Sequence, residues 1–449
     1  MNRKQEILFK ESPVWKAIYT MAVPAMVNIL VMILYNMADM FFIGQLGNSA
    51  LVAAVSICSP VFTMMMAFGS MIGGGGCALI ARTLGEKDAG HVSLYSSLCC
   101  WGSILIGAIF TVIVLLFQNP ILRVLGANDE IREYARAYLN ILAVGAPVMI
   151  FTTSMGNVVR AEGAVKEGMT GNLISTLTNV ALDPLFILVF RWGVSGAAVA
   201  TVLGNLAGAG YLIRYILCKG SNLSLSPKLA AAAPGEFRKV IAIGLPNGTN
   251  NILSSVSAAL ANNLLVTYGT VAVAAMAASG KSTTIISMIQ MGICMGVQPL
   301  MAYSYGAKDL PRIRETVSKL GILTFSFGLI TTLLCFFQSE KIIHIFLKDP
   351  AALVLGTEMI RLRVLTGPFL GFYYISSNFL QASGNAKMSI LVSLLRQGIF
   401  FIPLIYVMNS LFGVTGNICA HIAADALAAL VGVILALRQY RMLRRTLSA

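Results

Sequence analysis

The stretch from Ile18 to Ile43, IYTMAVPAMVNILVMILYNMADMFFI, decides the fold. It is apolar and long enough to cross a bilayer as one helix, which takes about 20 such residues. A single carboxylate, Asp39, interrupts it. A charge at the centre of a membrane costs about 2.5–3.5 kcal/mol on insertion scales. We therefore expect Asp39 to face a water-filled interior or a partner group and to serve a function.

The composition of the whole chain agrees with this stretch. Of its 449 residues 57% are hydrophobic and 11% charged, whereas soluble domains have about 25% charged residues. The net charge is +14, but the basic residues are scattered over short loops. This pattern predicts membrane topology and contact with anionic lipids, and it argues against nucleic acid as a partner. The eight cysteines show neither metal-ligand nor disulfide spacing.

Apolar segments recur along the chain and predict an all-α integral membrane protein with twelve transmembrane helices. We place them at 16–40, 50–80, 94–117, 136–158, 169–190, 194–218, 239–266, 271–303, 317–338, 358–381, 387–409 and 413–437. With the N-terminus inside, 22 of the 32 Lys and Arg fall in inside segments, and eight, including Arg361 and Arg363, fall outside. The positive-inside rule then places both termini in the cytoplasm. We expect the protein to lie in the plasma membrane as a multi-pass protein.

The two halves of the chain resemble each other at a nearly constant offset of 220 to 222 residues. The matching pairs include Pro24 and Pro246, Gly85 and Gly306, Lys87 and Lys308, Asp88 and Asp309, Asn157 and Asn378, Gly163 and Gly384, and Gly193 and Gly413. Six helices per half is an even number, so both copies enter the membrane from the same side. This predicts two six-helix bundles related by a parallel pseudo-two-fold repeat.

The repeat also sets the predicted domains. Residues 1–218 form an N-lobe with helices 1–6, and residues 219–237 form a Ser-, Ala- and Pro-rich cytoplasmic linker. Residues 238–449 form a C-lobe with helices 7–12 and a basic cytoplasmic tail.

One face of the helix at 169–190 is polar. It carries Asn172, Ser175, Thr176, Asn179 and Asp183 at spacings of three and four residues. In lipid such a face points into the bundle, and Asn179 and Asp183 are spaced to hydrogen-bond one another. The alternative is a structural clamp between helices, in which each side-chain bond contributes about 0.6 kcal/mol.

Further polar groups of the first half are expected to join this face in one cavity. They are Asn28, Tyr35, Asn36 and Asp39 on the first helix, Asn157 on the fourth, and Thr201 and Asn205 on the sixth. Two carboxylates in one low-dielectric site cannot both stay ionised easily, which favours proton uptake near neutral pH. Pro24 lies one turn before Asn28 and removes a backbone donor, so it is a candidate hinge.

The second half has different interior groups, so coupling chemistry is predicted to be confined to the first half. Asp425 is expected to pair with Lys281 or Arg396, because an unpaired charge at that depth is costly. His421 is either satisfied packing or a substrate contact, and Gln381 is a further candidate for the substrate cavity. Met64, Met288 and Met291 are either gap-fillers or part of a surface that accepts many apolar ligands.

Four segments together resemble the multidrug and toxic compound extrusion (MATE) transporters. They are NMADMFFIGQLG at 36–47, ARTLGEKD at 81–88, RAEG at 160–163 and NVALDP at 179–184. The resemblance covers essentially the whole chain. It implies cation-coupled efflux of structurally diverse small-molecule drugs and cationic amphiphiles by a functional monomer that needs no cofactor beyond H⁺ or Na⁺.

The resemblance is to the DinF-like bacterial branch. Carried over, the coupling site is Asp39, Asn157, Asn179, Asp183 and Thr201, with Asp39 as the principal proton acceptor and Pro24 at the bend of the first helix. The resemblance implies that this coupling site holds either no metal ion or a sodium ion. The other bacterial branch uses carboxylates on the seventh and tenth helices. Here the seventh has none and the tenth only Glu358 at its outer end.

Two other readings are open. A lipid-linked precursor flippase of the same superfamily would have a more cationic central cavity than Lys281 and Arg396 provide. A membrane-embedded enzyme would cluster its catalytic groups, whereas His91, His344 and His421 lie on three distant segments. No Walker motif occurs in the sequence, which argues against direct use of ATP.

Overall fold

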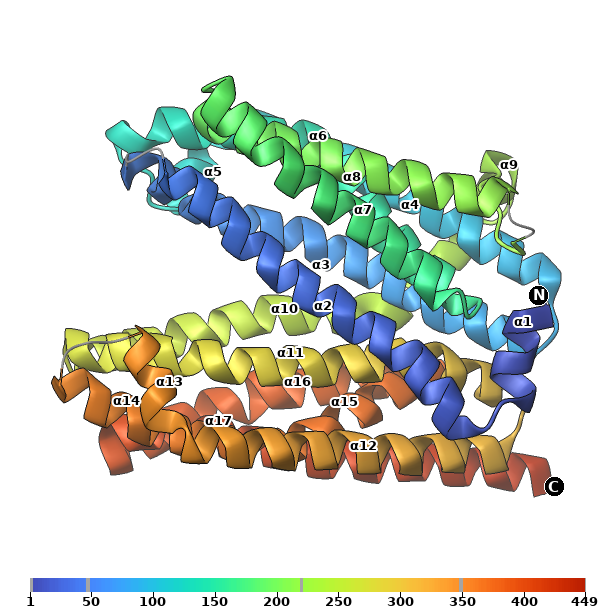
Figure 1. Ribbon diagram of the computed structural model, residues 1–449. Helices are drawn as coiled ribbons and strands as arrows, with labels where there is room; N and C mark the ends of the chain where they lie inside the picture. Colours follow the sequence, from blue (N-terminus) through green and yellow to red (C-terminus); the bar gives the residue numbers. More distant parts are fainter. Residues whose placement is uncertain (1–2, 46–48, 219–220, 347–349, 449) are drawn as a thin grey trace. The chain divides into compact units, whose positions relative to one another are not determined.

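The computed structural model describes residues 3–45, 49–218, 221–346 and 350–448. Within these residues every regular element is helical (Figure 1). The described chain contains nine helical segments that are long and apolar enough to cross a membrane. The predicted all-α, multi-pass membrane fold is therefore confirmed.

The long helices are α2 (Val14–Gly44), α3 (Ser49–Gly85), α4 (Ala89–Leu116), α6 (Asp129–Ala161), α7 (Val165–Pro184), α8 (Gly193–Cys218), α10 (Phe237–Val266), α11 (Thr270–Gly306), α12 (Leu310–Phe337), α14 (Pro350–Arg363), α15 (Gly367–Ala382), α16 (Ala386–Leu394) and α17 (Phe401–Ser448). The short ones are α1 (Arg3–Glu6), α5 (Gln118–Val124), α9 (Pro227–Ala232) and α13 (Ser339–Phe346), with π turns η1 (Ile7–Glu11), η2 (Leu185–Val189) and η5 (Leu395–Ile399) and 3₁₀ turns η3 (Pro234–Glu236) and η4 (Val364–Thr366).

These elements account for the twelve predicted spans. The first six are α2, α3, α4, α6, α7 with η2, and α8, and the next three are α10, α11 and α12. The tenth combines α14, η4 and α15. The eleventh runs through α16 and η5 into α17, which Gly413 (φ 59°) divides so that its remainder forms the twelfth.

The internal repeat is visible in the backbone. Lys87 and Lys308, 221 residues apart, both have the left-handed backbone that non-glycine residues seldom adopt, with φ of 63° and 56°. The aspartate that follows each lysine caps the next helix. Asp88 accepts a hydrogen bond from the His91 amide, and Asp309 accepts one from the Arg312 amide. Equivalent residues thus start the third helix of each half.

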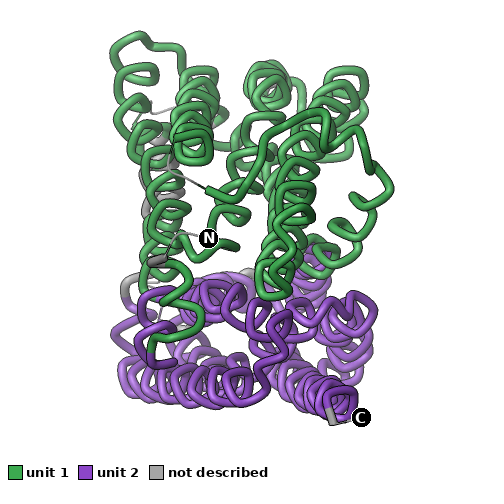
Figure 2. The backbone as a smooth tube through the Cα atoms, turned by 90° about the vertical axis from the view of Figure 1, so that its right-hand side faces the viewer, with its two compact units in different colours: residues 1–12, 23–248 green, residues 13–22, 249–449 purple. Residues whose placement is uncertain are grey.

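The chain divides into two compact units (Figure 2). The first holds residues 1–12 and 23–248, and the second holds residues 13–22 and 249–449. One boundary lies between η1 and α2, and the other two fall inside helices, next to Pro24 in α2 and next to Pro246 in α10. The start of α2 groups with the second unit and the start of α10 with the first.

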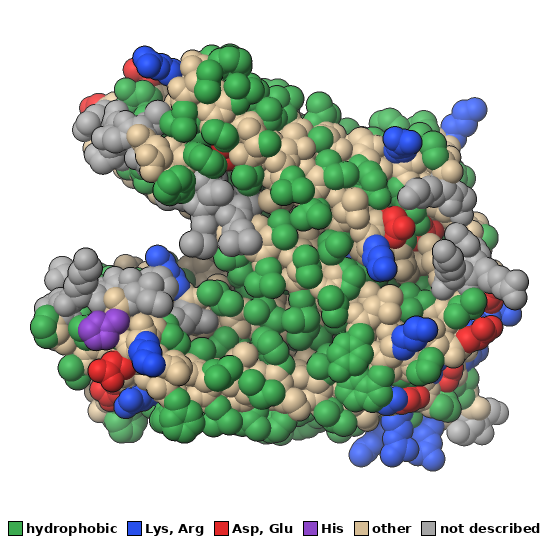
Figure 3. All heavy atoms as spheres, in the orientation of Figure 1, with side chains coloured by type: hydrophobic (Ala, Val, Ile, Leu, Met, Phe, Trp, Pro, Cys, Tyr) green, Lys and Arg blue, Asp and Glu red, His purple; other side chains and the backbone are tan. Residues whose placement is uncertain are grey.

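The surface fits a lipid environment. On the face shown in Figure 3, charged side chains gather mostly near the helix ends and hydrophobic side chains cover the area between them. Large apolar side chains are exposed on the described chain, such as Leu116 (72% exposed) and Phe337 (77% exposed). In water such exposure would be unfavourable, but it is what a helix facing lipid requires.

Candidate ion and substrate sites

The first unit holds a small buried polar cluster between α7 and α8. Asn179 and Asp183 come from α7 and Thr201 from α8, and each is at most 3% exposed. The Asn179 Nδ2 group donates to Asp183 Oδ1 at 3.4 Å and to Thr201 Oγ1 at 3.2 Å. The hydrogen bond predicted from the four-residue spacing is therefore present, and the amide joins the carboxylate to the hydroxyl.

Glycines bring the two helices close enough for these short side chains to meet. A Cβ at Gly204 would lie 2.5 Å from the Ser175 carbonyl oxygen, and one at Gly208 would lie 2.8 Å from that of Gly171. Small residues of this kind let helix backbones pack directly in membranes. α7 ends at Pro184 and continues as the π turn η2, an irregularity that is frequent at functional sites. The polar cluster thus lies directly before a break in helical geometry.

The cluster offers oxygen ligands. Within the described chain, the buried Asn179 Oδ1 atom accepts no hydrogen bond. Together with the Asp183 carboxylate and the Thr201 hydroxyl, it forms a set suited to a proton or a hard cation. Among the residues that the structure describes, no group of three or more His, Cys, Asp or Glu side chains is placed to hold a metal ion.

The other predicted coupling residues are Asn157, which has different hydrogen-bond partners, and Asp39, whose side chain lies outside the described residues. Asn157 is buried, donates to the Thr153 carbonyl at 2.7 Å and accepts a hydrogen bond from the Arg160 guanidinium. The backbone of α2 includes Asp39, Tyr35 and Asn36, but their side chains lie outside the described residues.

The remaining candidates of the first half are distributed over several helices. Pro24 is buried within α2, and Asn28 is half-buried one turn later. Asn205 donates to the Thr201 carbonyl at 2.9 Å. Asn172 and Thr176 are half-buried on α7, and Met64 on α3 is 45% exposed.

The second unit contains a cavity of about 400 Å³. Its walls come from α10, α11, α14, η4, α15, η5 and α17. Three predicted substrate residues line it, namely Met288, Met291 and His421. Gln381 is not among the lining residues. It is buried on α15, where its Oε1 accepts a hydrogen bond from Gln298 Nε2 at 2.7 Å.

An ion pair lies in the wall of this cavity. Arg396 Nε donates to Asp425 Oδ1 at 2.6 Å, and the two side chains are 10% and 13% exposed. Of the two partners that the sequence left open for Asp425, Arg396 is the one within ion-pair distance. The same guanidinium lies 4.6 Å from the Tyr373 ring centre and donates to the Tyr374 hydroxyl at 3.4 Å. Its position is thus fixed by a carboxylate and two aromatic side chains.

Arg363 is a cavity residue that the sequence analysis missed. It was assigned to an outside segment with Arg361, but it is the last residue of α14 and lines the cavity. Arg361 has different surroundings, since its Nε donates to Ser339 Oγ at 3.0 Å and its guanidinium lies over the Phe336 ring. A signal was available in the sequence, because Arg363 lies among apolar residues that are buried in the structure, namely Met359, Ile360 and Val364.

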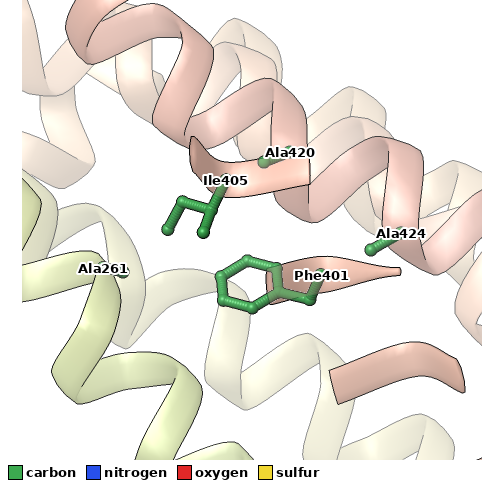
Figure 4. Close-up of a cluster of buried hydrophobic side chains, with 5 residues drawn as sticks. All are labelled: Ala261, Phe401, Ile405, Ala420 and Ala424. Carbon is green, nitrogen blue, oxygen red and sulfur yellow. The ribbon is translucent and has the colours of Figure 1, made fainter. Parts of the chain in front are cut away.

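His421 lies between the cavity and the apolar core. Its ring centre is 4.3 Å from that of Phe401. Phe401 belongs to a buried cluster with Ala261, Ile405, Ala420 and Ala424 (Figure 4). One side of the imidazole therefore packs against hydrophobic residues, while the side chain also lines the cavity. The packing predicted as one alternative for His421 is thus present, and a substrate contact stays a prediction.

Comparison with known proteins places this geometry in a family. The MatE family model matches residues 24–185 and 246–407, and the two matches are offset by 222 residues. The multidrug export protein MepA of Staphylococcus aureus (strain MRSA252) is 30% identical over 440 residues, covering 97% of this chain and 96% of that protein. MepA of Staphylococcus saprophyticus is 28% identical over 435 residues, with the same coverage.

Solved structures agree in fold. The crystal structure of MATE in the bent conformation superposes with a TM-score of 0.94 at 20% identity and covers 100% of both chains. The MatE matches include both halves of the chain and cover well over half of its length. The chain therefore belongs to the MatE family of membrane transporters and is not an enzyme.

Proposed function

We propose that the protein is a secondary active antiporter that exports small amphiphilic and cationic drugs in exchange for H⁺ or Na⁺. The naming of its relatives as multidrug export proteins supports the substrate class. The observation that carries the coupling proposal is the buried Asp183–Asn179–Thr201 cluster. A carboxylate buried in a membrane protein is costly, and its retention is expected where it binds the coupling ion.

In the proposed mechanism, protonation in the first half of the chain controls access. Asp39 is the principal proton acceptor, and Asn157, Asn179, Asp183 and Thr201 complete the coupling site. Uptake of an external proton neutralises the carboxylate, lowers the affinity for the drug and favours its release outside. A bound ion shifts the conformational equilibrium only as far as its affinities for the two states differ, so a hundredfold difference supplies about 2.7 kcal/mol.

Sodium is the second candidate for the coupling ion. Carboxylate, amide and hydroxyl oxygens are the ligands that hard cations prefer. The described part of the cluster contains one of each kind, so the ligand set suits either ion. Imposing proton and sodium gradients separately distinguishes the two.

Replacement of Asp39 tests the proposal. Proteoliposomes that contain the protein and a fluorescent cationic dye are given either a pH gradient or a sodium gradient. We expect Asp39→Asn to abolish gradient-driven dye export, because the amide cannot take up the coupling ion. The loss should be about hundredfold or more, in keeping with the removal of an essential proton-transfer group.

The matched control is Asp129→Asn. Asp129 begins α6, and its side chain is 94% exposed next to Arg132. This variant removes the same charge and should export the dye normally. Normal export by a well-folded Asp39→Asn variant would refute the coupling assignment. If export depends only on a sodium gradient, the antiport mechanism stands and the coupling ion is Na⁺.

A lipid-linked precursor flippase is the second candidate function. It is favoured by the presence of Arg363 in addition to Arg396 in the wall of the second-unit cavity, since anionic lipid headgroups pair with arginine. A sugar-lipid translocation assay with purified protein tests it. Translocation without dye export would replace the antiporter proposal.

The placement in the cell is also proposed. The distribution of basic residues supports both termini in the cytoplasm and a position in the plasma membrane. Anionic membrane lipids then contact the basic tail. The antiporter is proposed to work as a monomer, since each predicted site lies within one chain.

A further inference from the structure

The charges that line the second-unit cavity are unbalanced. Arg363 and Arg396 contribute two guanidinium groups, and Asp425 contributes one carboxylate, which Arg396 already engages. Among the described residues, no carboxylate oxygen lies within ion-pair distance of Arg363. Its Nη1 donates to the Met276 sulfur at 3.3 Å, and a thioether is a weak acceptor.

An arginine in such a place needs an anion. Arg363 is half-buried in the cavity wall, and withdrawing a guanidinium from water without a paired charge is unfavourable. Membrane proteins keep ionisable groups of this kind mainly where they serve a ligand or an ion path. The planar fork of the arginine side chain matches the two oxygens of a carboxylate or a phosphate. Arg363 therefore has the chemistry of an anion receptor that faces an open cavity.

The rest of the wall suits an organic molecule. The Tyr374 hydroxyl lies within hydrogen-bond distance of both Arg396 and Ser287, at 3.4 and 2.9 Å. Met288 and Met291 supply flexible apolar surface. The volume of about 400 Å³ falls in the range typical of small-molecule sites. An amphiphile with one anionic group would find both a charge partner and apolar contacts.

We infer that Arg363 and Arg396 bind the anionic group of a carboxylate- or phosphate-bearing amphiphile in this cavity. This inference rests on the proposed export function and deepens it by naming the two residues that hold the anionic group of a substrate. The coupling cation and the anionic group of the substrate are then held in different units. The first-unit cluster consists of Asn179, Asp183 and Thr201, whereas the second-unit cavity carries the arginines.

Equilibrium binding to the purified full-length protein tests the inference. The probes are one fluorophore in three forms, as a free carboxylate, a methyl ester and a quaternary ammonium derivative. We expect the carboxylate to bind at least about tenfold more tightly than the ester, because only the carboxylate can pair a negative charge with the guanidinium. Arg363→Gln should remove this preference, and Arg363→Glu should reverse it in favour of the ammonium form.

Arg361→Gln is the matched control. It removes the same side chain two residues earlier, at a position that contacts Ser339 and Phe336 and does not line the cavity. It should bind all three probes as the wild type does. Size-exclusion chromatography and thermal unfolding show whether each variant is folded, and Arg363→Lys provides a second variant that keeps the charge. Equal binding of the carboxylate and the ester to the wild type overturns the inference, as does an unchanged preference in a folded Arg363→Gln variant.

Competition identifies the source of the anionic group. Displacement of the carboxylate probe by a free aromatic carboxylate supports a soluble substrate, and displacement by a short-chain phosphatidylglycerol supports a lipid headgroup. Probe binding that neither competitor reduces overturns the inference. The binding assay needs no ion gradient, so its failure is separable from failure of the antiport proposal, which the Asp39→Asn export assay measures.

Discussion

Asp425 is the residue on which the charge balance of the second unit depends. Its carboxylate is 13% exposed and accepts a hydrogen bond from Arg396 at 2.6 Å. Removing one partner of a buried pair leaves the other charge uncompensated, at a cost of about 3–5 kcal/mol. We expect Asp425→Asn to lower the free energy of unfolding by that amount and to lower the thermal unfolding temperature in detergent accordingly.

The double variant Arg396→Gln with Asp425→Asn provides the control. It removes both charges and should recover at least half of the lost stability, because replacing a whole buried pair is often close to neutral. A double-mutant cycle measures this recovery. If the two single changes simply add, Arg396 and Asp425 contribute independently and the pair is not the source of the stability.

Contacts between side chains of one helix were predicted from the sequence better than contacts between side chains of several helices. Asn179 and Asp183 were expected to bond because a four-residue spacing places them on one face. Arg363 was misplaced because it stands two residues after Arg361. Consecutive residues turn by about 100° around a helix, so these two arginines point in nearly opposite directions. The composition of a short basic segment does not reveal which of them faces inward.

Glycines allow some helices to pack with their backbones in direct contact, and substitution of these glycines tests that packing. In the first unit, a Cβ on Gly244 of α10 would overlap the Met71 carbonyl group of α3. A Cβ on Gly248, one turn later on the same helix, would lie 3.6 Å from the Met71 Cβ, an ordinary contact. These two glycines form a matched pair that differs only in how closely the facing backbone approaches.

We expect Gly244→Ala to destabilise the protein by about 1–3 kcal/mol or more, because the two helices must separate to accommodate the methyl group. Gly248→Ala should be neutral or stabilising by up to about 1 kcal/mol, since alanine is the better helix former. Thermal unfolding of both variants measures the difference. Equal effects of the two changes would show that α3 and α10 do not pack at Gly244.

The linker shows why elements of low hydrophobicity were harder to predict. Residues 219–237 were expected to form a linker, and the described part contains the short helix α9. Trp101 Nε1 donates to the Leu225 carbonyl at 3.0 Å, and Tyr215 and Ser221 donate to the buried Glu162 carboxylate. Burial raises the pKa of Glu162, whereas these two hydrogen bonds act in the opposite direction. Such contacts join residues far apart in the sequence, which no local pattern reveals.

In the whole molecule, the internal repeat and the difference between the interior groups of its two halves were both predicted, whereas the second arginine of the second-unit cavity was not. Repeated helix ends such as Lys87 and Lys308 keep their backbone conformation in both halves, because capping and turn chemistry depend on a few local residues. The interior groups have diverged. His421 and Asp425 occupy the positions that match Thr201 and Asn205, so the same architecture carries an acidic cluster in one unit and a cavity with two arginines in the other.

The two prolines beside the unit boundaries are placed where a helix could bend. Pro24 and Pro246 lie within three residues of the points at which α2 and α10 pass from one unit to the other. Each lacks an amide hydrogen, so the carbonyl groups of Thr20 and Ala242 lose their helical partner there. A helix weakened in this way bends more easily. If coupling is confined to the first half, Pro24 is the hinge that matters for it.

We therefore expect Pro24→Ala to slow proton-driven dye export about tenfold, as hinge changes commonly reduce turnover, while equilibrium dye binding is kept. Pro246→Ala removes the equivalent proline of the second half and should retain at least half of the export rate. Stopped-flow dye efflux from proteoliposomes measures both rates, and binding to the detergent-solubilised protein shows whether each variant is intact. Equal slowing by the two substitutions would mean that both halves bend in the transport cycle and that the hinge follows the symmetry of the fold instead of the position of the coupling site.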